Sequence, residues 1–313
     1  MNNWLKRLVG YAYIPVSFSV YWILHQTGIP GFWVFYGGTG ILILMNHLME
    51  QLMPWEKSWR KADDQLVNEV GHTFLTALVG HTLGRFLAVT MMGALVVAAP
   101  VTGRPWWPNQ LPFAAQVALA VLIWDLGIYW NHRFLHSSAW RFHSLHHKLR
   151  RLTWLNSGYG HPVQFVTTSF CGISLLYLVG LPKEVAIFTS YWTFALNFLP
   201  HSNINMEMGF LNYIFSTPQV HRWHHIGDEN GRQVNFGMHL SIWDIVFGTF
   251  ILPKREANPA LLGDPEPHPA GFLAQWIGPF VPETVRARWA TIPSKREPFT
   301  IRNAISSDAR NPQ

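Results

Sequence analysis

The chain has 313 residues, enough for one large domain or two small ones with a sizeable core. Charged residues make up 13% of it, about half the share in ordinary soluble proteins, which excludes a typical soluble protein. The net charge of +6 raises the question of nucleic-acid binding, but the basic residues lie between apolar runs. That arrangement favours anionic lipid headgroups and no nucleic-acid partner. The single cysteine, Cys171, excludes an internal disulfide.

Six apolar runs are candidates for membrane spans, since a hydrocarbon core of about 30 Å takes about 20 helical residues. We expect these spans at residues 10–27, 30–53, 83–99, 113–131, 163–181 and 184–200. Residues 66–82 are apolar but carry His72 and His81, so they are expected to form an interfacial or partly buried helix. No small-residue cleavage site follows the first run, and we expect that run to remain as an anchor.

Basic residues gather on one side of this topology. The other side holds mainly Arg104 and Lys183. The larger set consists of Lys6, Arg7, Lys57, Arg60, Lys61, Arg133, Arg141, Lys148, Arg150, Arg151 and Arg222. By the positive-inside rule, the N-terminus and the histidine-rich segments face the cytoplasm. We therefore expect an integral, multi-pass protein of a bacterial inner membrane or the endoplasmic reticulum.

The predicted fold is all-α, a polytopic transmembrane bundle of about four to six spans with a cytoplasmic helical cap. Three parts are expected along the chain: N-terminal transmembrane and interfacial helices at 1–112, a catalytic domain at 113–255, and a cytoplasmic tail at 256–313. The last dozen residues are expected to be disordered.

Eight of the sixteen histidines fall in three short strings, HRFLH, HSLHH and HRWHH. Spacings of three and four residues place side chains on one face of a helix. A neutral imidazole offers one lone pair, so several must converge to hold a divalent ion. The strings are His132 and His136; His143, His146 and His147; and His221, His224 and His225. They predict a polyhistidine metal site in which ligand type alone leaves Fe, Zn, Cu and Ni open.

Other metal proteins fit the pattern less well. No HExxH motif and no glutamate beside a string supports a zinc protease, and haem ligation would place single histidines in the middle of spans. Isolated histidines are expected to be satisfied core or helix-end residues. This group comprises His25, His47, His81 and His239, with His72 less certain and His268 expected to be solvated.

The strings, with the segments around them, resemble the fatty acid hydroxylase / sterol desaturase superfamily of membrane di-iron enzymes. The similarity covers roughly residues 115–255, including Trp124–Trp130 before the first string and His161-Pro162 after the second. It continues through Thr217–Val220, Asn235-Phe236-Gly237 and Trp243–Thr249. The N-terminal runs fit the family only in general character.

The resemblance implies a site for two iron ions. The implied ligands are His132, His136, His143, His146, His147, His221, His224 and His225, joined by His161 and His201 at intermediate positions. For these last two, a supporting contact or helix capping is the alternative to ligation. One departure from the family is Gln164, where members often carry a glutamate.

Three further residues are expected to support the ligands. Ligating imidazoles normally donate their second N–H to a carboxylate or carbonyl. Asp125 lies seven residues before His132 and is expected to orient a site histidine, with pairing to Arg133 as the alternative. Asp244 and Asn235 are weaker candidates, and for Asn235 a turn role is equally expected.

The implied chemistry is O2-dependent hydroxylation or desaturation of a membrane lipid such as a fatty acyl chain or sterol, with the head group of an ornithine-type lipid as an alternative substrate. These two reactions share the removal of a first hydrogen, and the sequence leaves both open. Zinc has no accessible redox change, so iron is the expected metal. No His-Pro-Gly-Gly haem motif is present, so electrons are expected from a separate donor protein of the ferredoxin or cytochrome b5 type.

Two functions of other classes remain open at this point. A metal transporter would need ionisable groups distributed through the membrane, whereas these histidines lie at helix ends. A non-catalytic metal-binding membrane protein would tolerate a redox-inert ion.

Overall fold

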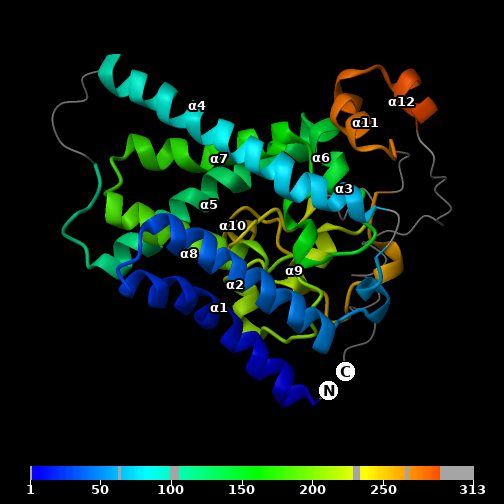
Figure 1. Cartoon of the computed structure of the whole chain (residues 1–313), viewed down its shortest axis with the longest axis horizontal. Helices are drawn as coiled ribbons and strands as arrows, with labels where there is room; N and C mark the ends of the chain where they lie inside the picture. The colour runs from blue at the N-terminus through cyan, green and yellow to red at the C-terminus, as the bar shows by residue number, and fades with distance from the viewer. Residues whose placement is uncertain (1, 63–64, 99–105, 228–232, 265–267, 290–313) are drawn as a thin grey trace.

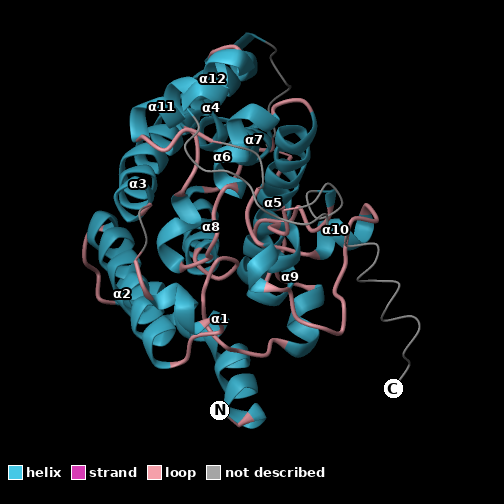
Figure 2. Cartoon of the chain, turned by 90° about the vertical axis from the view of Figure 1, so that its right-hand side faces the viewer, coloured by secondary structure: helices cyan, strands magenta, loops and turns pink. Residues whose placement is uncertain are grey.

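The computed structural model describes residues 2–62, 65–98, 106–227, 233–264 and 268–289. These residues form helices and loops, with three isolated β-bridges and no β-strand among them (Figures 1 and 2). The expected all-α architecture is therefore confirmed. The predicted disorder of the last dozen residues lies outside the described part of the chain.

The long helices are α1 (Asn3–Gln26), α2 (Gly31–Leu52), α4 (Ala77–Ala98), α5 (Phe113–Ser137), α7 (Pro162–Leu178) and α8 (Lys183–Asn197). The short α-helices are α3 (Leu66–Gly71), α6 (Trp140–His147), α9 (Pro218–His224), α10 (Ile242–Val246), α11 (Phe272–Ile277) and α12 (Glu283–Trp289). Between them lie η1 (Lys57–Arg60), η2 (His72–Thr76), η3 (Trp154–Gly158), η4 (Gly209–Tyr213), η6 (Pro259–Leu261) and η7 (Gly278–Phe280).

Four helical segments of the described chain are long and apolar enough to cross a membrane: Asn3–Gln26, Gly31–Leu52, Leu66–Leu95 and Phe113–Ser137. The sequence predicted six. The remaining two, α7 and α8, have 17 and 15 residues, about 26 and 23 Å at 1.5 Å per residue, which is less than the hydrocarbon core. The bundle thus combines four full-length helices with a shorter hairpin packed among them.

The third span starts earlier than predicted. Helix α3 runs through a π-helical turn, η2, into α4 without a break. His81 on α4 does not interrupt the apolar helix, because its Nδ1 lies 2.6 Å from the hydroxyl of Ser169 on α7. A polar side chain that finds its partner within the bundle is tolerated inside a membrane helix.

Small residues allow the bundle helices to approach closely. Helix α4 packs mainly on α7, while α5 packs on α7 and α8. Gly80 and Gly84 of α4 and Gly127 of α5 each lie against the backbone of α7. Helix association in membranes depends on this kind of close backbone contact, since lipid tails are as apolar as the side chains.

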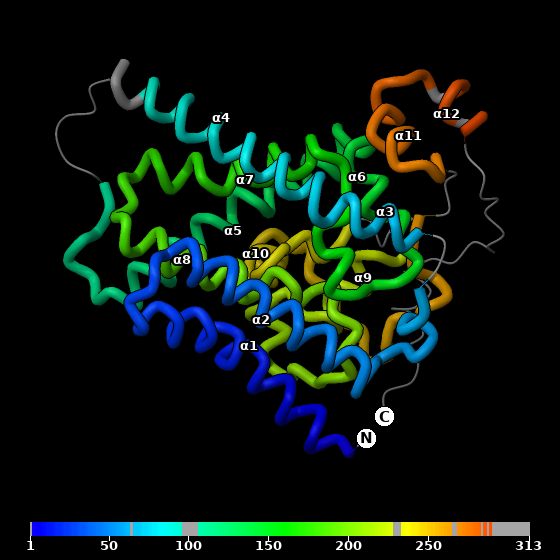
Figure 3. Tube along the Cα trace, in the orientation of Figure 1, coloured from blue at the N-terminus to red at the C-terminus, as the bar shows by residue number. Residues whose placement is uncertain are grey.

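One end of the bundle carries the predicted metal ligands. We call this end the cap; it comprises residues 57–61, the last turns of α5, residues 140–161 with α6 and η3, α9, and the loops at residues 198–217 and 233–264 (Figure 3, right-hand side). The N-terminus lies at the same end, and the α1–α2 and α7–α8 connections lie at the opposite end. Residues 268–289, expected in a surface tail, include the short helices α11 and α12, of which α11 lies beside α3. His268, expected to be solvated, is buried.

The contact of Gly84 with α7 yields a test of this packing. A β-carbon at Gly84 would overlap the carbonyl oxygen of Val166, whereas one at Gly37 of α2 would meet nothing within 4 Å. Alanine gains up to about 1 kcal/mol of helix propensity over glycine, but overpacking costs about 1–3 kcal/mol. We expect Gly84→Ala to lower the Tm in detergent and Gly37→Ala to leave it unchanged or raise it. Equal Tm values for the two variants would contradict the packing.

Candidate metal centre

Nine buried histidines come together in the cap. His132 and His136 lie on the last turns of α5, and His143, His146 and His147 lie on α6. The third string lies on α9 and its C-terminal cap, and His201 follows α8. All nine side chains are almost completely buried.

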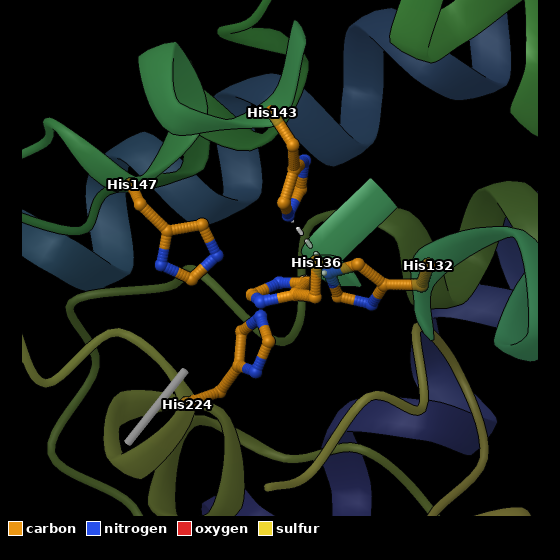
Figure 4. A group of neighbouring side chains, drawn as sticks. All are labelled: His132, His136, His143, His147 and His224. Atoms are coloured by element: carbon orange, nitrogen blue, oxygen red, sulfur yellow. Dashed lines mark hydrogen bonds between the residues drawn. The ribbon is translucent and has the colours of Figure 1, made fainter. Parts of the chain in front are cut away.

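The nine imidazoles divide into two groups. Within each group the potential ligand nitrogens lie within 4.8 Å of one another. The five-histidine group contains His132, His136, His143, His147 and His224 (Figure 4). The four-histidine group contains His146, His201, His221 and His225. The groups adjoin, since the rings of His147 and His225 stack with centroids 4.5 Å apart.

The paired histidines of the strings separate into different groups for a geometric reason. Successive residues on a helix point about 100° apart, so His146 and His147 diverge from α6. His224 and His225 diverge in the same way at the end of α9. The second and third strings therefore each supply histidines to both groups, whereas the first string, with only i and i+4 spacing, supplies both of its histidines to one group.

In the five-histidine group, unprotonated nitrogens face one another. The Nδ1–H of His132 donates to the carbonyl of Phe236 over 2.6 Å, so its Nε2 carries a lone pair. Nδ1 of His143 lies 2.9 Å from Oε1 of Gln164, which leaves its Nε2 unprotonated as well. These two Nε2 atoms are 2.9 Å apart. Two lone pairs at that distance repel, and a cation bound by both removes the repulsion.

The four-histidine group has the same organisation. The Nδ1–H of His146 donates to the carbonyl of Tyr159 over 2.7 Å. Nε2 of His221 lies 3.1 Å from Nε2 of His201 and 3.1 Å from Nε2 of His225. Nε2 of His147 and Nε2 of His224, both in the five-histidine group, are buried and have no hydrogen-bond partner. Buried polar atoms are normally paired, so these two atoms and the facing Nε2 atoms of both groups fit the binding of metal ions.

Burial keeps these imidazoles neutral. Desolvation lowers the pKa of His146 to about 4. It holds the pKa values of six further histidines of the two groups well below the ordinary value: His143, His147, His201, His221, His224 and His225. Neighbouring imidazoles add to this effect, because each disfavours a positive charge on the next. At neutral pH the lone pairs are therefore available to a metal without loss of a proton.

A single loop orients one ligand from each of two strings. The carbonyl of Val234 accepts from Nδ1–H of His224 over 2.8 Å, and the carbonyl of Phe236 accepts from His132. Between them, Asn235 adopts a left-handed φ of 54°. Its side-chain amide donates to the carbonyls of Val220 and Ile251. Asn235 is thus a turn residue, and the carbonyls on either side of it belong to the residues that contact His224 and His132.

Asp244 fixes the other side of this loop. Its carboxylate accepts from the backbone N–H groups of Phe236 and Gly237 over 2.7 and 2.8 Å, and from the hydroxyl of Thr249 over 2.7 Å. Burial nevertheless raises its pKa to about 6. Asp244 acts on His132 through the Phe236 peptide.

Asp125 does not contact any of the nine histidines. Its carboxylate accepts from the backbone N–H groups of His239 and Leu240 and lies 3.0 Å from Nδ1 of His239, outside both groups. The alternative partner, Arg133, instead lies over the rings of Tyr129 and Trp130. The expected link to a site histidine is absent because the 239–240 segment occupies the face of α5 two turns below His132.

His161 lies outside both groups. Its Nδ1 accepts the backbone N–H of Val163 at the start of α7, and its Nε2–H donates to the carbonyl of Trp276 over 2.9 Å. With both nitrogens engaged it has no lone pair for a metal. The geometry matches the helix-capping alternative, whereas His201 lies inside the four-histidine group.

Gln164, which departs from the family pattern, has a partner that the sequence does not predict. In the structure its side chain, on the first turn of α7, accepts from His143. Only the packing of α7 against α6 determines that partnership.

The division into two groups predicts distinct metal contents for two histidine variants. His201→Ala should lose the ion of the four-histidine group, whereas His161→Asn should retain both ions, since asparagine can also cap a helix. Elemental analysis of the purified variants measures this. Loss of metal in His161→Asn together with full occupancy in His201→Ala would reverse the assignment.

The lowered pKa values predict a pH-dependent stability of the metal-free protein. Below a pH of about 6.5, histidines of the unfolded chain take up protons, whereas those of the folded cap do not. The free energy of unfolding therefore decreases as the pH is lowered. The raised pKa of Asp244 has the opposite effect on stability, but it is one group, whereas seven histidines with lowered pKa values are named above. We expect the Tm of metal-free protein to be constant from about pH 8 to 7 and to decline between about pH 6.5 and 4.5. A constant Tm across that window would contradict the burial of neutral imidazoles.

Comparison with known proteins agrees with this geometry. Residues 117–249 match the family model "Fatty acid hydroxylase". The chain is 38% identical over 238 residues to "Ornithine lipid hydroxylase OlsE" of Rhizobium tropici, covering 74% of this chain and 71% of that protein.

More distant relatives include the "Alkylglycerol monooxygenase" of Danio rerio, 28% identical over 71% of this chain and 49% of that protein. The "Sphinganine C4-monooxygenase 1" of Arabidopsis thaliana is 26% identical over 47% of this chain and 59% of that protein. No solved structure matches. The chain belongs to the fatty acid hydroxylase / sterol desaturase superfamily, and it is an oxidoreductase of the lipid hydroxylase type.

Proposed function

We propose that this chain uses two iron ions, O2 and an external electron donor to hydroxylate an amino-acid lipid of the ornithine type. The observation that carries the substrate class is the 38% identity to an ornithine lipid hydroxylase, which extends over 74% of the chain. That extent reaches beyond the 117–249 segment shared with the family as a whole. It therefore includes sequence outside the conserved core of the family.

The position of the ligands supports a reaction close to the lipid head group. His132 and His136 lie at the end of the span Phe113–Ser137, and the remaining ligands lie in the cap beyond it. Lipid chains fill the bilayer core, and head groups begin where such a span ends. Carbon atoms of the head group or of the adjoining chain would reach this depth.

Iron is supported by the donor set and by the reaction. Imidazole suits several transition metals, but zinc lacks the redox change that oxygen chemistry requires. Bound iron would supply the activation of O2 with two electrons from outside. An ion held by the four-histidine group would have fewer protein ligands than one held by the five-histidine group.

The chain's own residues shape the site in two ways. Outward hydrogen bonds from His132, His146 and His224 to backbone carbonyls fix the ring orientations. Aromatic rings enclose the five-histidine group, with Trp140 5.3 Å and Phe236 5.2 Å from the ring of His136. An apolar enclosure of this kind excludes water from the reacting centre.

We further propose that the cap and N-terminus face the cytoplasm and receive electrons from a soluble or membrane-bound donor of the ferredoxin or cytochrome b5 type. The basic residues of η1, Lys57 and Arg60, and those of α6 and the turn after it, Arg141 and Arg150, all lie at the cap end. Their position supports a cytoplasmic cap by the positive-inside rule.

Lipid analysis of cells tests the reaction. Expression in a bacterium that makes ornithine lipids should yield an ornithine lipid heavier by one oxygen atom. His146→Ala should abolish the product, because it removes one of the four imidazoles of the four-histidine group. His161→Asn is the matched control and should retain the product.

Other outcomes separate the parts of the proposal. Oxygen gained by a lipid without an amino-acid head group would reject the substrate class, and loss of two hydrogens would reject hydroxylation in favour of desaturation. An unchanged lipid profile with iron-loaded protein and an active donor would reject the function.

A further inference from the structure

The short helix α11 presents two different faces. Its inner face is held by the bundle: the Gln275 side chain lies 2.8 Å from Nε2 of His72, and the Trp276 indole donates to the hydroxyl of Thr76 over 3.1 Å. The ring of Phe272 packs 4.6 Å from that of His72. These contacts fix α11 along α3 and η2, at the start of the span Leu66–Leu95.

The outer face of α11 and η7 is apolar and exposed. Leu273 is 71% exposed, Ile277 50% and Phe280 67%. Their spacing of four and three residues places them on one helical stripe. Exposed large apolar side chains in such a stripe mark a surface that another apolar phase covers.

The neighbouring helical segment, from α3 to α4, indicates that this apolar phase is lipid. Val67 and Val70 of α3, Phe74 of η2 and Leu78 of α4 form a second exposed apolar stripe. That stripe belongs to a candidate membrane span, so its outer part meets lipid. The stripe of α11 lies beside it, because the side chain of Asn68 donates to the carbonyl of Ala270 and Phe272 lies against Gly71.

The length of the span gives the depth. Leu66–Leu95 contains 30 residues, about 45 Å of helix, which exceeds a hydrocarbon core of about 30 Å. The N-terminal turns of this segment lie at the cap end (Figure 1), so the excess length there reaches the level of the head groups, and α11 lies beside those turns. Arg286 and Arg288 on the following helix α12 add positive charge suited to anionic lipid.

We propose that α11 and η7, residues 272–280, form an interfacial helix that inserts Leu273, Ile277 and Phe280 into the bilayer beside α3. The 256–313 region is then partly a membrane-contacting element rather than a tail free in the cytoplasm. It sets the height of the cap above the membrane, since Gln275 contacts Tyr159 and Trp276 contacts His161. The carbonyl of Tyr159 in turn orients His146.

Site-specific fluorescence tests this proposal without relying on enzyme activity. The native cysteine is first replaced in Cys171→Ala, and an environment-sensitive label is attached in Leu273→Cys or Ile277→Cys. The full-length, metal-loaded protein is placed in lipid nanodiscs containing anionic phospholipid, with or without brominated acyl chains. Leu83→Cys, exposed in the middle of a span, is the lipid control, and Lys61→Cys, exposed in the cap, is the water control.

We expect labels at positions 273 and 277 to be quenched by brominated lipid as at position 83, and to resist aqueous iodide. Quenching by iodide to the extent seen at position 61 would overturn the proposal. Resistance to both quenchers would also overturn it, because a second copy or a partner protein would then cover the stripe. Metal content measured on each labelled variant establishes that the cap is intact.

Discussion

Unprotonated imidazole nitrogens that face one another at about hydrogen-bond distance are the interaction on which the cap depends. His132 and His143, with Nε2 atoms 2.9 Å apart, illustrate it. Without a cation such pairs repel, and with one they become ligands. Because ligand binding to the folded state adds to its stability, metal ions bound by these groups would stabilise the cap.

For the Nε2 lone pairs to point into the histidine groups, the Nδ1–H of each ring needs a hydrogen-bond acceptor on the opposite side of the ring. The cap supplies carbonyls from separate loops, those of Tyr159, Val234 and Phe236. Helices of the bundle hold these loops in turn. Glu50 of α2 accepts from the backbone N–H groups of Trp154 and Asn203. These bonds cross the boundary expected at residue 112, so the N-terminal helices are part of the metal site's support.

A buried ion pair extends this support. Arg151, just after the second histidine string, lies 2.7 Å from Glu69 on α3, with both side chains buried. Breaking such a pair by removing one partner is strongly destabilising, because it leaves an uncompensated charge. The loop that orients His146 is thereby tied to the same helix against which α11 packs.

The sequence by itself determined the all-helical membrane architecture and singled out eight of the nine histidines that the structure brings together, because both depend on local spacing. The length of an apolar run reflects the thickness of the bilayer, and i, i+3 and i+4 spacings place side chains on one face of a helix. His201, the ninth, followed from the family resemblance. The partnerships between distant segments were decided only by the tertiary structure. Examples are the separation of His146 and His147 into different groups and the pairing of Asp125 with His239. Two others are the helix-capping contact of His161 and the contact of Gln164 with His143. Sequence spacing fixes which way a side chain leaves its own helix, but which helix lies opposite depends on how the whole bundle packs.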